Sequence, residues 1–190
     1  MSDTGVPEAD AVALVGNPRP GSRTAGLATA VLDAVLADLG RPGGGHPIDL
    51  GELLASAGAP LGQGSGERYA EPLARFHAAS LAVIATPVYK GSYTGLLKAF
   101  LDHVAAGALH RTVAIPVITV GSPTHALAAD VHLRPLLVEL GAVVPTAALV
   151  VAEADLADPA GVIAAWLATA APALRALLGA GRPVASGVAS

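Results

Sequence analysis

The chain has 190 residues, of which 53% are hydrophobic and 14% are charged, and its formal net charge is −4 at pH 7. This length fits one domain, and the mildly acidic balance argues against a nucleic-acid partner. No cysteine is present, which excludes disulfides, thiolate catalysis and cysteine metal sites and fits a reducing cytoplasm. We expect one domain over 11–178, between flexible tails at 1–10 and 179–190.

The start of the chain and its apolar stretches predict a soluble protein. The first residues, MSDTGVPEAD, are acidic and polar, unlike a signal peptide. The longest apolar stretch, AVVPTAALVVA, has 11 residues including a proline, and is too short to cross a membrane. We therefore expect a cytoplasmic protein with no membrane partner.

Apolar runs of strand length alternate with helical patterns along the chain. Strands are predicted at 11–16, 81–86, 112–120 and 142–151, with a weaker one at 46–50. Helices are predicted at 24–39, 67–79, 96–104, 125–140 (interrupted near Pro135) and 159–178. A glycine-rich loop is expected at 55–66.

Strands that are apolar on both faces and alternate with helices predict a parallel sheet covered by helices on both sides. Five such strands fit the flavodoxin-like order 2-1-3-4-5, in which ligands bind beyond the carboxyl ends of the strands. Polar loops at 17–24, 87–94 and 121–126 follow the first, third and fourth strands. We expect these three loops to meet in one crevice.

The first of these loops, within GNPRPGSRTAG (16–26), has the chemistry of a phosphate site. A helix that begins after a strand presents unpaired N–H groups. Ser22 and Thr24 add hydroxyl donors, and Arg19 or Arg23 adds a guanidinium that suits phosphate. Ser22-Arg23 stands where a Walker A loop has Lys-Ser/Thr, and the dinucleotide pattern G-x-G-x-x-G is absent. An irregular turn with solvated arginines is the alternative.

The second loop, within TPVYKGSYTG (86–95), suits a flat ring. Tyr89 and Tyr93 form an aromatic pair in a chain that is only 3% aromatic. Both lysines of the protein, Lys90 and Lys98, also fall in or just after this loop. Alternatively, the tyrosines are ordinary rim or interface residues.

Three stretches resemble the NADPH-dependent FMN reductase family, in particular the reductases of two-component alkanesulfonate monooxygenase systems: GNPRPGSRT, ATPVYKGSYTGLLKAFLDH and GSPTHALAADVHLRPLLVELGA. The resemblance covers roughly 11–150 and implies a flavodoxin-like fold, FMN as the flavin and NADPH or NADH as hydride donor. Val131 and His132 stand where some sulfonate-type members carry an extra aromatic residue.

The resemblance also implies which residues bind the cofactor. The FMN phosphate falls on Arg19, Ser22, Arg23 and Thr24, and Asn17 stands where many members have serine. The isoalloxazine ring lies along the second loop, and the third loop borders its other side. These two loops contribute Pro87, Val88, Tyr89, Lys90, Gly91, Gly121 and Ser122.

The expected reaction needs little side-chain chemistry. A nicotinamide stacked on the flavin passes hydride to flavin N5, so the protein supplies orientation and electrostatics. We name no catalytic acid or base and no metal ligand, because the histidines lack metal-site spacing. His125, beside the third loop, is the only histidine we expect near the flavin.

Three functions fit these motifs. The leading one is an NAD(P)H:FMN reductase that supplies reduced flavin to a partner monooxygenase. The second is a reductase that retains its flavin and reduces a quinone, an azo compound or a metal oxyanion. The third is a flavodoxin-like electron carrier or flavin-binding protein, which the loop arginines and the mild charge disfavour.

Two further expectations concern assembly and flavin retention. Leu96, Leu97, Phe100, Leu101 and Val104 lie on more than one face of the 94–104 helix, which predicts an apolar surplus that needs a partner. The family resemblance implies that this helix contributes to a subunit interface, so we expect a homodimer or homotetramer. The loop at 55–66 has no bulky side chain except Leu61 and should not form a tight lid. The protein should therefore purify largely without flavin.

Overall fold

The computed structural model of the protein describes residues 11–56 and 65–179. These residues form a five-stranded parallel sheet in the order β2-β1-β3-β4-β5, so the predicted fold class and strand order are confirmed. The strands are β1 (Ala11–Val15), β2 (Gly45–Asp49), β3 (Leu81–Pro87), β4 (Val113–Val120) and β5 (Leu149–Ala152). The predicted tails lie outside the described residues, except for Gly179, which ends the last helix.

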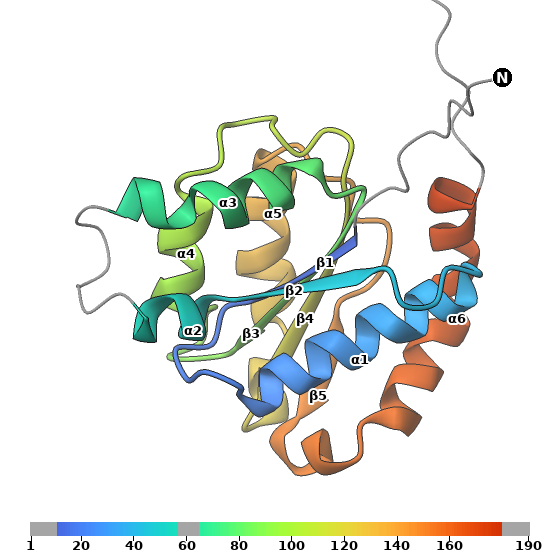
Figure 1. The fold of residues 1–190 in the computed structure, drawn as a ribbon. Helices are drawn as coiled ribbons and strands as arrows, with labels where there is room; N and C mark the ends of the chain where they lie inside the picture. The colour runs from blue at the N-terminus through green and yellow to red at the C-terminus, as the bar shows by residue number, and fades with distance from the viewer. Residues whose placement is uncertain (1–10, 57–64, 180–190) are drawn as a thin grey trace, which may run out of the picture.

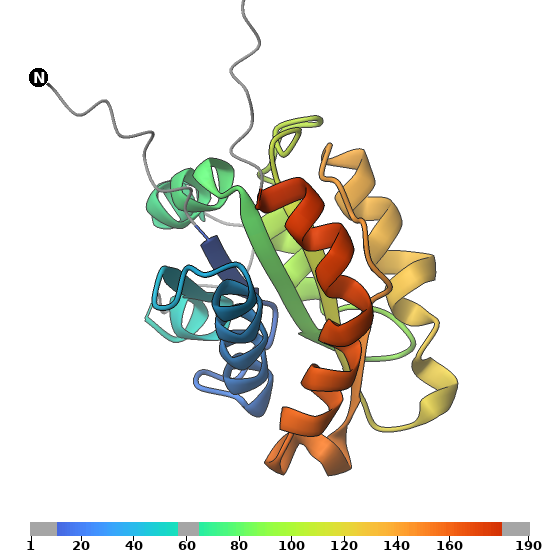
Figure 2. The ribbon, with the colours of Figure 1, turned by 90° about the vertical axis from the view of Figure 1, so that its right-hand side faces the viewer.

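Helices cover both faces of the sheet (Figure 1). One layer consists of α1 (Arg23–Asp38) and α6 (Ala160–Leu178), which lie side by side in Figure 2. The other layer consists of α2 (Leu50–Ala55), α3 (Ser65–Ala78), α4 (Gly95–Leu101) and α5 (Arg134–Glu139). Short segments η1 (Pro123–His125), η2 (Ala129–Leu133) and η3 (Glu153–Ala157) complete the chain.

The central strands supply two separate cores because successive residues point to opposite faces. On β1, Val12 and Leu14 enter the core beneath α3, α4 and α5. Ala13 and Val15 enter the core beneath α1 and α6. Every residue of β1, β3 and β4 is buried, which explains why these strands read as continuous apolar runs.

Helix α1 begins and ends at residues suited to those positions. Ser22 is its N-cap, and the Ser22 hydroxyl accepts a hydrogen bond from the Ala25 N–H at 3.2 Å. At the other end Gly40 has φ of +73°, a conformation that glycine adopts without strain. These residues therefore set the two ends of α1, whose N-terminus follows the first polar loop.

The predicted strand 142–151 is mostly wrong, since β5 begins only at Leu149. Before it, Val143 makes one isolated bridge to Val113, and Pro145 has no N–H for a ladder. The Arg134 guanidinium donates to the carbonyls of Val144 and Thr146, at 3.0 and 2.7 Å. An arginine from a preceding helix thus takes the carbonyls that a neighbouring strand would have used.

The predicted helix 125–140 is also divided. Segment η1 is a 3₁₀ turn, η2 is a π-helix, and only the six residues of α5 are α-helical. The interruption expected near Pro135 is confirmed, because that proline lies in the first turn of α5, where its missing N–H costs no helical bond. Helix α2, in contrast, was not predicted, and 57–64 of the expected glycine-rich loop lie outside the described residues.

Helix α6, with 19 residues, is a longer apolar segment than the 11-residue stretch identified from the sequence, which corrects that expectation. Among the described helices, it is the one long and apolar enough to cross a membrane by length and composition, with a mean hydropathy of 1.6. In this structure its Ile163, Leu174 and Leu178 enter the core beside α1. This packing is typical of a helix that covers one face of a sheet.

Helix α4 has no exposed apolar surplus of the kind that its sequence pattern predicts. The five apolar residues at 96–104 are all buried within this chain, with exposed fractions of 5% or less. They contact the sheet on one side and α3 on the other, where Phe100 meets Tyr69 and Phe76 edge to face. No apolar surplus therefore remains on α4 for a second subunit.

Candidate functional site

The three polar loops meet at the carboxyl edge of the sheet, as predicted. They follow β1, β3 and β4, which are neighbouring parallel strands. The Thr94 hydroxyl, in the second loop, donates a hydrogen bond to the carbonyl of Gly16, where the first loop begins. The Val88 N–H donates to the Thr119 carbonyl of β4 at 2.9 Å. Direct bonds thus hold the second loop to its neighbours on both sides.

The first loop is held from within by Asn17, which is buried. Its side-chain NH₂ donates to the Thr24 hydroxyl oxygen at 3.0 Å, and its side-chain carbonyl accepts from the Arg19 N–H at 3.0 Å. The Gly21 N–H donates to the Asp49 carboxylate at 3.0 Å. Both functional groups of Asn17 are therefore committed to the shape of the loop.

Three consecutive backbone N–H groups follow at the start of α1. In the part of the chain that the structure describes, the N–H groups of Ser22, Arg23 and Thr24 donate no hydrogen bond. The hydroxyls of Ser22 and Thr24 already accept one bond each and retain a hydrogen to donate. Unpaired N–H groups at the positive end of a 16-residue helix are the donors that a phosphate needs.

The two arginines of this loop are both exposed. Arg23 extends across the edge of the sheet, where its Nη1 donates to the Glu153 carbonyl at 3.3 Å. Arg19 lies in the loop between two prolines. Their charges flank the start of α1, although Arg23 is drawn toward η3 by its bond.

The second loop is a tight hairpin. Tyr89 and Ser92 exchange both backbone hydrogen bonds, and Lys90 and Gly91 between them have φ of +54° and +80°. Both turn residues are left-handed, as in a type I′ turn. Lys90 is the one non-glycine residue with positive φ in the described chain. Such strain is most common where a loop is built for a ligand.

The side chains of this hairpin divide between core and solvent. Pro87 is buried at the end of β3, and Val88 and Tyr93 pack against the core. Tyr89 is 46% exposed. The predicted aromatic pair is therefore split, and only Tyr89 is free to contact a ring. Lys98 on α4 pairs with Asp102, the C-cap of that helix, and this hydrogen bond raises the pKa of the lysine.

The third loop joins β4 to η1. The Ser122 hydroxyl caps η1 by accepting from the Thr124 N–H at 3.4 Å. Gly121 is exposed and lies close to Glu153. His125 is exposed at the end of η1. Among the described residues, no group of three or more metal-ligating side chains comes together.

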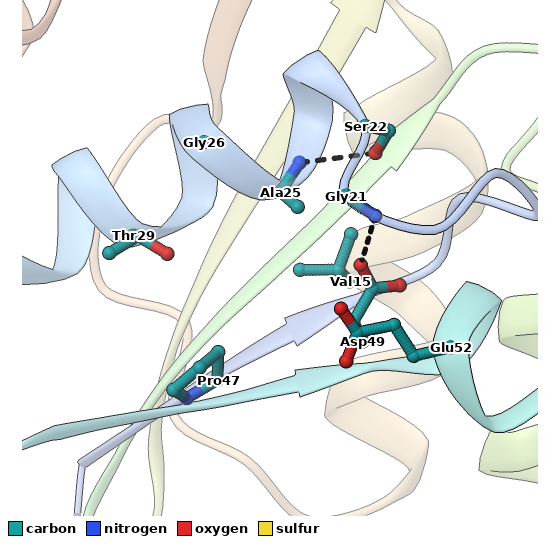
Figure 3. A pocket seen from close by; sticks show the side chains of 9 residues that line it. All are labelled: Val15, Gly21, Ser22, Ala25, Gly26, Thr29, Pro47, Asp49 and Glu52. Atoms are coloured by element: carbon teal, nitrogen blue, oxygen red, sulfur yellow. Dashed lines mark hydrogen bonds between the residues drawn. The ribbon is translucent and has the colours of Figure 1, made fainter.

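A cavity of about 310 Å³ lies beside the first loop, between α1, β2 and α2 (Figure 3). Two acidic residues that line it, Asp49 and Glu52, were absent from the sequence-based site. The sequence could have indicated Asp49, because β2 neighbours β1 in the predicted strand order. A polar residue at the end of β2 is therefore expected beside the first loop. The lining consists of Val15, Gly21, Ser22, Ala25, Gly26, Thr29, Pro47, Asp49 and Glu52.

A family model described as NADPH-dependent FMN reductase matches residues 10–156. The chain belongs to this family. This FMN reductase is 39% identical over 150 residues to the NADH-dependent FMN reductase SfnF of Pseudomonas fluorescens, covering 77% of this chain and 78% of that one. It is 34% identical over 147 residues to the FMN reductase (NADPH) of Pseudomonas aeruginosa, covering 76% and 77%.

Solved structures agree with this assignment. The FMN reductase superposes on the apo form of the NADH:FMN oxidoreductase EMOB with a TM-score of 0.70 and 32% identity, over 92% of each chain. The expectations of the family, the flavodoxin-like fold, the reaction and its cofactors are confirmed. The protein is an NAD(P)H-dependent FMN reductase.

Proposed function

We propose that this FMN reductase binds the phosphate of FMN at the start of α1 and releases reduced FMN to a separate flavin-dependent monooxygenase. The observation that carries the phosphate site is the run of three unpaired N–H groups at Ser22, Arg23 and Thr24. With the hydroxyls of Ser22 and Thr24, they offer five donors, and Arg19 and Arg23 supply positive charge.

The remaining predicted residues suit the flavin ring. The hairpin at 87–92 is closed by two backbone bonds and fixed to β4 through Val88, so it offers a rigid edge. Tyr89 is exposed near its start, and Gly91, one of the two turn residues, carries no side chain. We assign Pro87, Val88, Tyr89, Lys90 and Gly91 to the isoalloxazine, with Gly121 and Ser122 on its other side.

The protein's role in the reaction is then to hold FMN in one orientation. Bound FMN supplies an electrophilic N5 that accepts hydride from a nicotinamide. The N-terminus of α1 fixes the phosphate end, and the hairpin fixes the ring end, of one ligand. Because the Thr94–Gly16 bond joins these two loops, both ends are held in one register. No side chain needs to move a proton.

Release of the flavin is supported by the open character of the site. Arg19, Gly21 and Arg23 in the first loop are exposed, as are Tyr89 and Gly121 in the other two. Ion pairs made by exposed groups such as the guanidiniums of Arg19 and Arg23 contribute little, which is consistent with modest flavin affinity. Modest affinity is what an enzyme needs when its product must reach a second protein.

Flavin content and steady-state kinetics test this proposal together. Desalted protein should carry little FMN by its visible absorbance, and its NADH and NADPH oxidation should depend on added FMN and saturate with it. Stoichiometric FMN retained through desalting, with quinone reduction in the absence of added flavin, would contradict release and favour the flavin-retaining alternative.

We also propose a homo-oligomer and a cytoplasmic location. The three most exposed of the large apolar residues that the structure describes follow β4 in the chain: Leu127, Val131 and Val138, with exposed fractions of 69%, 58% and 56%. The absence of cysteine fits a reducing compartment. Light scattering at micromolar concentration should give a mass of at least two chains, and a monomer would contradict the assembly.

A further inference from the structure

The end of β2 lies directly beneath the first loop. The two oxygens of the Asp49 carboxylate are divided between two backbone donors: Oδ2 accepts from the Gly21 N–H at 3.0 Å, and Oδ1 accepts from the Gly51 N–H at 2.8 Å. Figure 3 shows the side chain of Asp49 directed at Gly21 from the opposite wall of the cavity. One side chain therefore caps α2 and holds the first loop at Gly21, the residue before the N-cap of α1.

The same part of α2 also approaches the loop from below. A Cβ atom at Gly51 would lie 2.7 Å from the Asn17 carbonyl oxygen and 2.8 Å from the carbonyl carbon of Arg19. Only a glycine allows the backbone of 17–20 to rest so close to α2. Residues 49–51 thus contact the backbone of the first loop and support its conformation.

The charge on Asp49 makes this arrangement informative. A carboxylate beside a phosphate site repels the ligand, so charge alone disfavours aspartate here. The hydrogen bond from the Gly21 N–H gives the opposite contribution, because it holds Gly21 in its left-handed conformation with φ of +57°. The direction of the N–H groups of Ser22, Arg23 and Thr24 depends on that conformation.

We propose that Asp49 is a positioning residue for the FMN phosphate, acting through Gly21 on the unpaired N–H groups at the start of α1. This inference rests on the proposed phosphate site. It assigns a role in ligand binding to the end of β2, which neither the first-loop motif nor the family resemblance identified.

The decisive variant is Asp49→Asn, which keeps the size of the side chain. In the wild type the two N–H groups bond to different oxygens of Asp49. In asparagine an NH₂ group, which cannot accept, replaces one of these oxygens and faces the N–H of either Gly21 or Gly51. Positioning predicts that FMN binding, followed by quenching of flavin fluorescence, weakens roughly tenfold, while riboflavin binding is unchanged. A pure charge effect predicts the opposite sign, namely tighter FMN binding.

Glu52→Gln is the matched control. Glu52 lines the same cavity and carries the same charge, but it has no assigned bond to the first loop. FMN affinity in this variant should be unchanged or slightly higher. A loss equal to that of Asp49→Asn would overturn the proposal, since it would show that the effect does not depend on the hydrogen bond between Asp49 and Gly21.

A second variant covers the case in which Asp49→Asn does not fold. Gly51→Ala leaves Asp49 intact but displaces the backbone of 17–20, and it should produce the same loss specific to FMN. Equal weakening of FMN and riboflavin in either folded variant, or unchanged FMN binding in both, would overturn the positioning role. Wild-type protein that binds riboflavin as well as FMN would instead disprove the underlying phosphate site.

Discussion

The Thr94 hydroxyl donates to the carbonyl of Gly16, a residue 78 positions earlier in the chain. The same oxygen accepts from the Leu97 N–H at 3.1 Å and so caps α4. The Thr94 N–H donates in turn to the Thr86 hydroxyl at 3.2 Å. A single buried threonine therefore ties the end of β1 to the loop after β3, the two segments assigned to opposite ends of FMN.

Thr94→Val tests this connection. Valine keeps the shape but loses the cap and the bond to Gly16, and it leaves two buried backbone groups unsatisfied. We expect the free energy of unfolding to fall by about 2–3 kcal/mol in urea titrations. The KM for FMN should rise more than kcat falls. Thr94→Ser, which keeps the hydroxyl, should stay close to wild type, and an equal loss in both variants would contradict the role of the hydroxyl.

Arg23→Ala tests the charge assigned to the phosphate site. Because the guanidinium is exposed, we expect FMN binding to weaken only about tenfold, the lower end of a hydrogen bond to a charged group. Riboflavin binding should barely change. Arg111→Ala, which removes an exposed arginine at the opposite edge of the sheet, is the control for net charge. Equal weakening of both flavins would show that Arg23 does not contact the phosphate.

Lys90→Gly tests the strain in the hairpin. Glycine adopts φ of +54° without the steric cost that lysine carries there. We expect the free energy of unfolding to rise by about 1 kcal/mol. Gly91→Ala, at φ of +80°, should lower it by a similar amount. Destabilisation by Lys90→Gly would mean that the lysine side chain makes a stabilising contact that outweighs the strain.

Arg134→Leu tests the irregular segment before β5. The partly buried guanidinium holds two backbone carbonyls, at Val144 and Thr146, and its loss should destabilise the protein by about 2–3 kcal/mol. Arg134→Lys should recover only part of this, because one ammonium does not reproduce the planar fork. Hydrogen exchange should increase first at 142–148. Wild-type stability in the leucine variant would count against this role.

The sequence by itself determined the sheet, its strand order and the edge at which the loops meet. Continuous apolar runs, a capping serine at 22 and stop glycines at 40 and 141 depend on local preferences and on burial of both faces. Such signals can be recognised in the sequence without knowing which residues are in contact in the folded protein. The reaction could also be predicted from the sequence, because the family motifs that indicate it are short stretches located in these loops.

Only the tertiary structure decided which side chains are left for a ligand. Tyr93 packs against the core while Tyr89 remains exposed. Both side-chain groups of Asn17 form hydrogen bonds within its own loop. Arg134 takes two backbone carbonyls in the first part of the predicted strand 142–151, most of which is irregular. Asp49 joins the site from a strand whose sequence is barely apolar. Each outcome depends on hydrogen bonds between residues distant in sequence, and local pattern carries no information about those partners.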